Sequence, residues 1–268
     1  MNQIRPAAVA GTFYPGNEQV LSRAVDALLA QARPAHGPLP KALIVPHAGY
    51  IYSGPIAANA YRRIAAARGQ ITRVVLLGPA HRVAVRGLAL PQAQAFATPL
   101  GLVDIDQAAC SEIQNLTQVV RSAAAHALEH SLEVQLPFLQ KVLGDFKLVP
   151  LVVGNATAEE VAQVLDRLWG GPETLLVISS DLSHYLPYAQ AQRIDHKTSD
   201  MILQLQTGIT HEQACGGTPV NGLLLAAKQH GLKPELLDLR NSGDTAGNPE
   251  QVVGYASFAF VEEVRHVH

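Results

Sequence analysis

The chain has 268 residues, of which 48% are apolar and only 16% are charged, and its net charge is −2. These proportions exclude an intrinsically disordered chain, which needs low hydrophobicity and high charge. The near-neutral charge argues against nucleic acid or an anionic membrane as the main partner. No apolar run approaches the ~20 residues of a membrane span, and the first residues lack a signal-peptide pattern. Two cysteines cannot form a disulfide framework, so we expect a cytoplasmic protein.

Short apolar runs alternate with helical patterns along the chain. Continuous apolar runs of about 4–8 residues are typical of strands in a sheet that is covered on both faces. In chain order, the predicted strands are 42–45, 74–77, 148–153, 175–178, 236–239 and 255–261. The predicted helices are 19–30, 55–68, 107–117, 132–143, 158–168, 189–206 and 220–229. This alternation predicts a three-layer α/β fold with a largely parallel or mixed central sheet flanked by helices.

Two of these helices carry recognisable start signals. The segment ending in Thr157 precedes two glutamates and predicts a helix cap. Thr218 and Pro219 predict a cap and a first-turn proline for the last helix. Pro137 either lies in the first turn of its helix or kinks that helix.

Three predicted strands end in short turns that carry a histidine. His47, His81 and His184 each follow one of the apolar runs, and Asp181 shortly precedes the last of them. Ligands of open α/β sheets bind outside the carboxyl ends of the strands. We therefore expect the three histidines and Asp181 to meet in one crevice.

Cys215 lies in a Gly-rich segment just before a predicted helix. Glycines allow the backbone to approach a ligand closely. A helix N-terminus stabilises the thiolate, which is both the nucleophile and the metal ligand. Cys215 is therefore a further candidate ligand, although a free cysteine is more often a buried inert residue. Cys110, inside a helical pattern, is interpreted as such an inert residue.

His126, Glu129 and His130 match the H-x-x-E-H pattern of inverted zincins. On a helix, the two histidines would lie four apart on one face and could bind zinc, but no third ligand is evident. A zinc peptidase is therefore the weakest alternative. His130 and Glu133 could instead reach a strand-end site from the start of a helix. The acidic loop around Asp244 follows a strand, and a plain turn explains it as well as a site does.

Ordered motifs along the whole chain resemble the Memo family, whose bacterial members are called AmmeMemoRadiSam system protein B. The matching segments are 10–15 (AGTFYP), 46–54 (PHAGYIYSG), 78–81 (GPAH), 129–133 (EHSLE), 136–138 (LPF), 180–184 (SDLSH), 214–216 (ACG), 244–247 (DTAG) and 253–257 (VGYAS). Memo proteins are similar in fold to class III extradiol dioxygenases, which implies a single α/β domain over residues 1–268. The resemblance also implies a radical-SAM protein and an AMMECR-type protein as partners.

The resemblance further implies a metal site of His47, His81 and Cys215, with Asp181 and His184 alongside. The dioxygenases hold Fe(II) with two histidines and one carboxylate. Cys215 stands in the place of that carboxylate, and a thiolate shifts the metal preference toward copper, zinc or thiolate-bound iron. We therefore expect this chain to resemble the dioxygenases more in its fold than in ring-cleaving chemistry.

Together these features predict a metal-dependent oxidoreductase that holds iron, or else copper or zinc, and uses O2 on a small, phenolic substrate. His184 would be the general acid or base, because imidazole titrates near neutral pH, and Asp181 would orient His184 or the substrate. His130, Asp244 and Tyr52 are expected to contact the ligands or the substrate. The alternative is a non-catalytic protein whose pocket takes a peptide or partner loop. An open coordination position would distinguish the catalytic protein, because structural zinc sites are closed.

Overall fold

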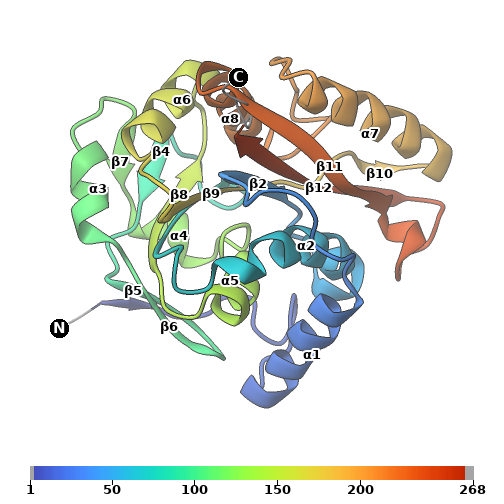
Figure 1. Ribbon diagram of the computed structural model, residues 1–268, viewed down its shortest axis with the longest axis horizontal. Coiled ribbons are helices and arrows are strands. Elements are labelled where there is room, and N and C mark those ends of the chain that lie inside the picture. The colour runs from blue at the N-terminus through green and yellow to red at the C-terminus, as the bar shows by residue number, and fades with distance from the viewer. Residues whose placement is uncertain (1–2, 263–268) are drawn as a thin grey trace, which may run out of the picture.

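The computed structural model describes residues 3–262, and its centre is a nine-stranded mixed sheet (Figure 1). The strand order is β10-β12-β2-β9-β3-β8-β4-β7, and β11 also pairs with β12. The four central strands are parallel neighbours: β2 (Ala42–Val45), β9 (Thr174–Ser179), β3 (Arg73–Pro79) and β8 (Lys147–Val153). The outer strands make the sheet mixed: β4 (Leu88–Leu90), β7 (Val119–Arg121), β10 (His184–Leu186), β11 (Leu232–Asn241) and β12 (Val252–Glu262).

Helices cover both faces of this sheet (Figure 1). On one face, α2 packs on β2, β11 and β12, and two helices pack against α2 in turn. On the other face, α8 packs on β3, β9 and β11, α7 packs on β11 and β12, and α6 packs on α8. The first group comprises α1 (Glu18–Gln31), α2 (Tyr50–Ile64) and α5 (Leu136–Leu143). The second comprises α6 (Ala158–Arg167), α7 (Tyr188–Leu203) and α8 (Gly217–Gln229).

The remaining elements are short. A small second sheet has the strand order β1-β5-β6. Its strands are β1 (Ile4–Arg5), β5 (Ala95–Thr98) and β6 (Gly101–Asp104). The short helices are α3 (Gln107–Ile113), α4 (Ala123–Ala127), η1 (Ala65–Ala67), η2 (Glu133–Gln135) and η3 (Ser242–Asp244). No helix between residues 3 and 262 is both long and apolar enough to cross a membrane.

The predicted α/β fold with a mixed sheet is confirmed: four of the predicted apolar runs form the central parallel strands, and the runs 236–239 and 255–261 lie in the antiparallel pair β11 and β12. Every residue of β2 and β9 is buried, as expected for strands covered on both faces. Thr157 caps α6 with a reciprocal bond to Glu160, and Pro137 lies in the first turn of α5. The predicted cap at Thr218 is wrong, because α8 begins earlier, after Gly216, which has no side chain to cap it.

Candidate metal centre

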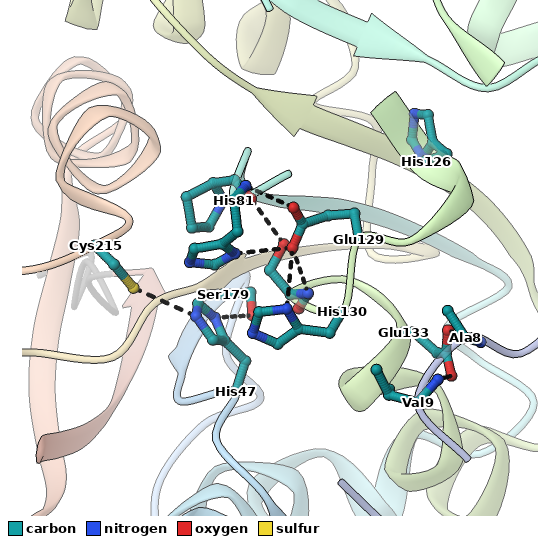
Figure 2. Close-up of polar contacts among 12 residues, drawn as sticks. Ala8, Val9, His47, His81, His126, Glu129, His130, Glu133, Ser179 and Cys215 are labelled. Carbon is teal, nitrogen blue, oxygen red and sulfur yellow. Dashed lines mark hydrogen bonds and ion pairs between the residues drawn. The ribbon is translucent and has the colours of Figure 1, made fainter. Parts of the chain in front are cut away.

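The carboxyl ends of β2, β9 and β3 lie side by side, because these strands are parallel neighbours. His47 lies two residues beyond the end of β2, His81 two residues beyond β3, and Asp181 two residues beyond β9. The rings of His47 and His81 meet with their centroids 5.2 Å apart (Figure 2). The topology thus brings these strand-end residues to one edge of the sheet.

A third histidine completes what we call the His cluster, which comprises His47, His81 and His130. The ring of His130 stacks on His81 with centroids 4.6 Å apart and lies edge-on to His47 at 5.4 Å. Potential ligand atoms of the three side chains lie within 4.8 Å of one another. His130 comes from the loop between α4 and η2 and follows no strand. We expected it to contact the ligands, and the structure places it among the potential ligands.

Hydrogen bonds fix which nitrogen of His47 carries the proton. The Ser179 hydroxyl donates to the Ser131 carbonyl oxygen at 2.6 Å, so it accepts from Nδ1 of His47, 2.9 Å away. Nε2 of Gln135 donates to the same hydroxyl oxygen at 2.8 Å. His47 therefore carries its proton on Nδ1, and its unprotonated Nε2 faces Sγ of Cys215 at 3.3 Å. An imidazole with an unprotonated Nε2 is a form that binds a metal.

Glu129 binds Nδ1 of His81, as Ser179 binds Nδ1 of His47. Its carboxylate accepts from the backbone nitrogen of His81 at 2.6 Å, from Nδ1 of His81 at 2.8 Å and from the backbone nitrogen of Ser131 at 2.9 Å. Burial alone would raise the pKa of Glu129, but the hydrogen bonds and the charge of His81 lower this pKa to about 2. An ionised carboxylate can only accept, so Nδ1 of His81 is the donor and Nε2 is the nitrogen left for a metal. A carboxylate behind a ligating histidine is the usual outer partner in metal sites.

His130 is the least satisfied member of the cluster. Within the described residues, its buried Nδ1 has no hydrogen-bond partner, and it lies 3.5 Å from Oε1 of Glu129. Burial, followed by the charge of His81, lowers the pKa of His130. Burial also holds the pKa of His47 well below its ordinary value. Burial therefore favours the neutral form of both rings, and an unpaired buried nitrogen within a group of three mutually close imidazoles fits a bound cation.

Close packing brings the His130 loop onto the sheet. A Cβ at Gly78, on β3, would lie 2.7 Å from the hydroxyl oxygen of Ser131 and 2.9 Å from the side chain of Leu132. The Ser131 hydroxyl also donates to the Pro79 carbonyl oxygen at 3.0 Å. Glycine at position 78 therefore allows this loop to reach the end of β3.

Cys215 lies beside the His cluster, just before α8. Its sulfur is 3.3 Å from Nε2 of His47 (Figure 2). The same sulfur is 3.7 Å from the Asp181 carbonyl oxygen. Gly216 allows this close approach, because a Cβ there would lie 2.8 Å from the Ser179 carbonyl oxygen. Burial, and then the charge of Asp181, raise the pKa of Cys215 to about 12, so its thiolate forms only beside a cation. Cys215 is thus adjacent to the cluster, and its role as a metal ligand stays a prediction.

A cavity of about 860 Å³ opens beside the cluster, and its wall includes His81, His184 and Cys215. His184 is half-buried on β10, which pairs with β12 at one edge of the sheet. Asp181 is buried, and its Oδ1 accepts from the backbone nitrogen of His47 at 2.7 Å. Burial raises the pKa of Asp181. The hydrogen bond of Asp181 thus goes to the His47 loop, whereas we expected it to orient His184 or the substrate.

Asp195, which the sequence did not single out, holds the segment before His184. This buried side chain on α7 accepts from the backbone nitrogen of Ser183 at 3.0 Å, and burial raises its pKa to about 6. The backbone nitrogen of Gly254 donates to the Ser183 carbonyl oxygen at 2.8 Å. After His184, Tyr185 has a φ of 56°, a left-handed value that is rare outside glycine. His184 therefore projects from a turn whose backbone is held by hydrogen bonds to Asp195 and Gly254 before it and is strained at Tyr185 after it.

Two other predicted contact residues have different surroundings. Oδ2 of Asp244 accepts from the backbone nitrogen of Asn241 at 2.8 Å, and Oδ1 accepts from the Tyr188 hydroxyl at 2.5 Å. The carboxylate therefore closes its own turn and ties it to α7, as the plain-turn interpretation expected. Tyr52 is partly buried in the first turn of α2, and its ring lies near Gly49 in the loop that follows β2.

The geometry gives no support to the zincin alternative. Helix α4 ends at Ala127, so His126 and His130 do not lie on one helix. Nε2 of His126 bonds to the Ala89 carbonyl oxygen at 2.8 Å, and its ring meets Phe96 edge-on. Figure 2 shows His126 well apart from the His cluster. Burial lowers the pKa of His126 to about 4, so its role is that of a neutral core histidine.

His126 should make the free energy of unfolding fall on acidification. Its folded pKa of about 4 lies below the ordinary 6.5, so the unfolded chain binds more protons between these values. The stability is complete above pH 6.5 and is lost as the pH falls toward 4, by up to about 3 kcal/mol. In urea unfolding, His126→Gln, which keeps a donor for Ala89, should show a smaller difference between about pH 7 and about pH 4.5 than the wild type. Parallel pH curves for the two proteins would contradict this assignment.

Comparison with known proteins agrees with the motifs and the fold. A family model described as Memo-like protein matches residues 5–259. The chain belongs to the Memo family. A MEMO1 family protein of Aquifex aeolicus is 38% identical over 272 residues, covering 97% of this chain and all of that protein. A MEMO1 family protein of Sulfolobus acidocaldarius is 36% identical over 282 residues, covering 96% of this chain and 99% of its own.

A solved structure supports the fold of this Memo-family chain. The crystal structure of uncharacterized protein JW3007 from Escherichia coli K12 matches with a TM-score of 0.53 and 16% sequence identity. The match covers 82% of this chain and 99% of the other. At this level of identity, the likeness concerns the fold alone.

Proposed function

We propose that this Memo-family protein is a metal-dependent oxidoreductase whose ion is held by the His cluster, with Cys215 as a further ligand. The observation that carries the proposal is that potential ligand atoms of His47, His81 and the incompletely bonded His130 lie within 4.8 Å of one another. Imidazole suits iron, copper and zinc, and a neighbouring thiolate favours the softer ions. We propose iron first and copper next, because the proposed chemistry requires a redox-active ion.

The cavity supports a small substrate with an apolar body. Its volume of about 860 Å³ falls within the range of about 300–1,000 Å³ usual for small-molecule sites. Apolar side chains, among them Val85, Val153 and Leu186, share its wall with His81 and Cys215. A phenol matches this lining, because its ring is apolar and its hydroxyl can turn toward the histidines. When bound, the ion would supply the one-electron chemistry that lets O2 react with such a substrate.

In this proposal, His184 moves the proton of the substrate. It lies in the wall of the same cavity as His81, and β10 together with Asp195 fixes the backbone from which it projects. A neutral imidazole nitrogen of His184 would accept the phenolic proton, and the resulting imidazolium would return it later in the cycle. Asp181 keeps the His47 loop in place and adds a buried carboxyl group beside the histidines.

The test is O2 consumption by the protein after anaerobic loading with Fe(II), Cu(II) or Zn(II). We expect uptake that depends on a catechol or simple phenol with iron or copper, and none with zinc. No uptake with iron or copper across a broad phenol panel would overturn the catalytic proposal. That outcome would instead favour the non-catalytic alternative, in which the pocket takes a peptide or partner loop and the metal is structural or regulatory.

A further inference from the structure

The N-terminal segment from Arg5 to Tyr14 is bonded to the loop that carries His130, although more than a hundred residues separate them. Arg5 is 5% exposed, and its guanidinium makes three different contacts. Nε donates to the His126 carbonyl oxygen at 2.8 Å, Nη2 donates to the Glu129 carbonyl oxygen at 2.7 Å, and Nη1 pairs with the carboxylate of Glu133. One buried side chain therefore joins three points of this loop.

Glu133 accepts hydrogen bonds from further residues of the N-terminal segment. Its fully buried carboxylate accepts from the backbone nitrogens of Ala8 at 2.8 Å and Val9 at 3.0 Å, from the Tyr14 hydroxyl at 2.5 Å, and from Arg5. Each oxygen thus has two donors, which compensates the cost of burying the charge. These bonds join the N-terminal residues, up to Tyr14 of the AGTFYP motif, to the EHSLE motif that carries His130.

The same N-terminal segment also touches the His cluster. The carbonyl oxygen of Glu129, held by Arg5, belongs to the peptide that leads into His130. The side chain of Glu129 holds both the backbone and Nδ1 of His81. On the open side, the ring of Phe13 packs on His130 with centroids 4.6 Å apart. Two members of the cluster are therefore oriented through contacts that begin in residues 5–14.

We infer that Arg5 is a positioning residue for the metal site, and that closure of the N-terminal segment and metal binding strengthen each other. This inference rests on the proposed metal site in the His cluster. Arg5 fixes the peptide between Glu129 and His130. A metal would hold His130 directly and Glu129 through its bonds to His81. Coupling of this kind is reciprocal: if closure raises the metal affinity, metal binding must favour closure by the same factor.

The first test compares Arg5→Lys with Arg63→Lys. Lysine keeps the charge opposite Glu133 but cannot reproduce the planar fork that reaches three partners at once. Arg63 is a matched control, because it is a similarly buried arginine that pairs with Glu235 at 2.7 Å. We expect Arg5→Lys to weaken Zn(II) binding by about 10–100-fold, the usual effect of losing an outer partner of a ligand. Arg63→Lys should leave the affinity unchanged, because its partner Glu235 is partly exposed and lies outside the His cluster.

The second test needs no variant and remains available if Arg5→Lys fails to fold. Amide hydrogen exchange of Ala8 and Val9, both bonded to Glu133, should slow when Zn(II) is added to the wild type. Altered Co(II) absorption in Arg5→Lys would report a changed ligand arrangement. If Arg5→Lys binds Zn(II) with the affinity of the wild type, Arg5 has a purely structural role. The same conclusion follows if Zn(II) binds to the wild type but does not change the amide exchange of Ala8 and Val9. If the wild type binds no Zn(II) or Co(II), the proposed metal site itself fails.

Discussion

Replacing His81 by alanine is expected to weaken Zn(II) or Fe(II) binding by at least about 100-fold. The reason is that loss of an outer-shell partner alone costs about 10–100-fold, and His81 offers a directly binding lone pair. His47→Ala and His130→Ala should have effects of similar size, because these residues complete the same cluster. The measurement is equilibrium competition against a chelator of known affinity, with metal content verified after desalting.

Cys215→Ser separates the two ligand sets under consideration. If the metal is held by the three histidines, Cys215→Ser should cost less affinity than His130→Ala. If Cys215 is the third ligand, as the family resemblance implied, the order should reverse. His196→Ala is the matched control, because this exposed histidine bonds to its own helix at the Gln192 carbonyl. Affinity that survives in His81→Ala but disappears in His126→Gln would contradict the assignment and favour the zincin alternative.

His184→Ala is expected to keep its metal and to lose about 10²–10⁴-fold of the phenol-dependent O2 consumption. This range is the usual contribution of a positioned acid or base. His184 lies in the cavity wall but outside the group of three mutually close donors, so its loss should spare the ion. Rates should be compared at matched metal content, since only then does a difference report proton transfer.

A pH profile tests whether His184 acts through its proton. Loss of the imidazole should remove one limb of the profile of the wild type, whereas a residue that merely shapes the cavity would lower the rate equally at every pH. His196→Ala again serves as a control that should leave rate and profile unchanged. Equal rates in His184→Ala and the wild type would remove this residue from the proposed mechanism.

The parts of the fold that followed from the sequence are those fixed by strong local patterns. The runs at 42–45 and 175–178 are buried on both faces and contain almost only large aliphatic residues, so their unbroken apolar character identifies them as central strands. Strands β6 and β7 were missed because they are only four and three residues long and mostly exposed. β6 pairs with the adjacent strand β5, whereas β7 pairs with β4, about thirty residues earlier in the chain.

The residues of the site also divide into those that the sequence could predict and those that it could not. His47 and His81 could be predicted because a strand end in a parallel sheet has a known direction and a known edge. His130 follows no strand, and its position depends on Arg5, Gly78 and Ser131, which lie far away or act through packing. The nearest signal was the order Glu129-His130-Ser131 within a family motif. Asp195 carried no local signal, because a buried aspartate on a helix resembles any surface aspartate in sequence.

The three histidines of the cluster come from segments that are far apart in the chain and meet only when the parallel strands have formed. An unfolded chain therefore presents no preorganised pair of these ligands, so an ion has little to hold it before the sheet assembles. Folding should precede loading during biosynthesis, and a chelator should strip the ion without unfolding the protein. By mass action, free metal at 100 times its dissociation constant would add about 2.7 kcal/mol to the free energy of unfolding. In a cell, the supply of the metal would then influence how long each copy survives proteolysis.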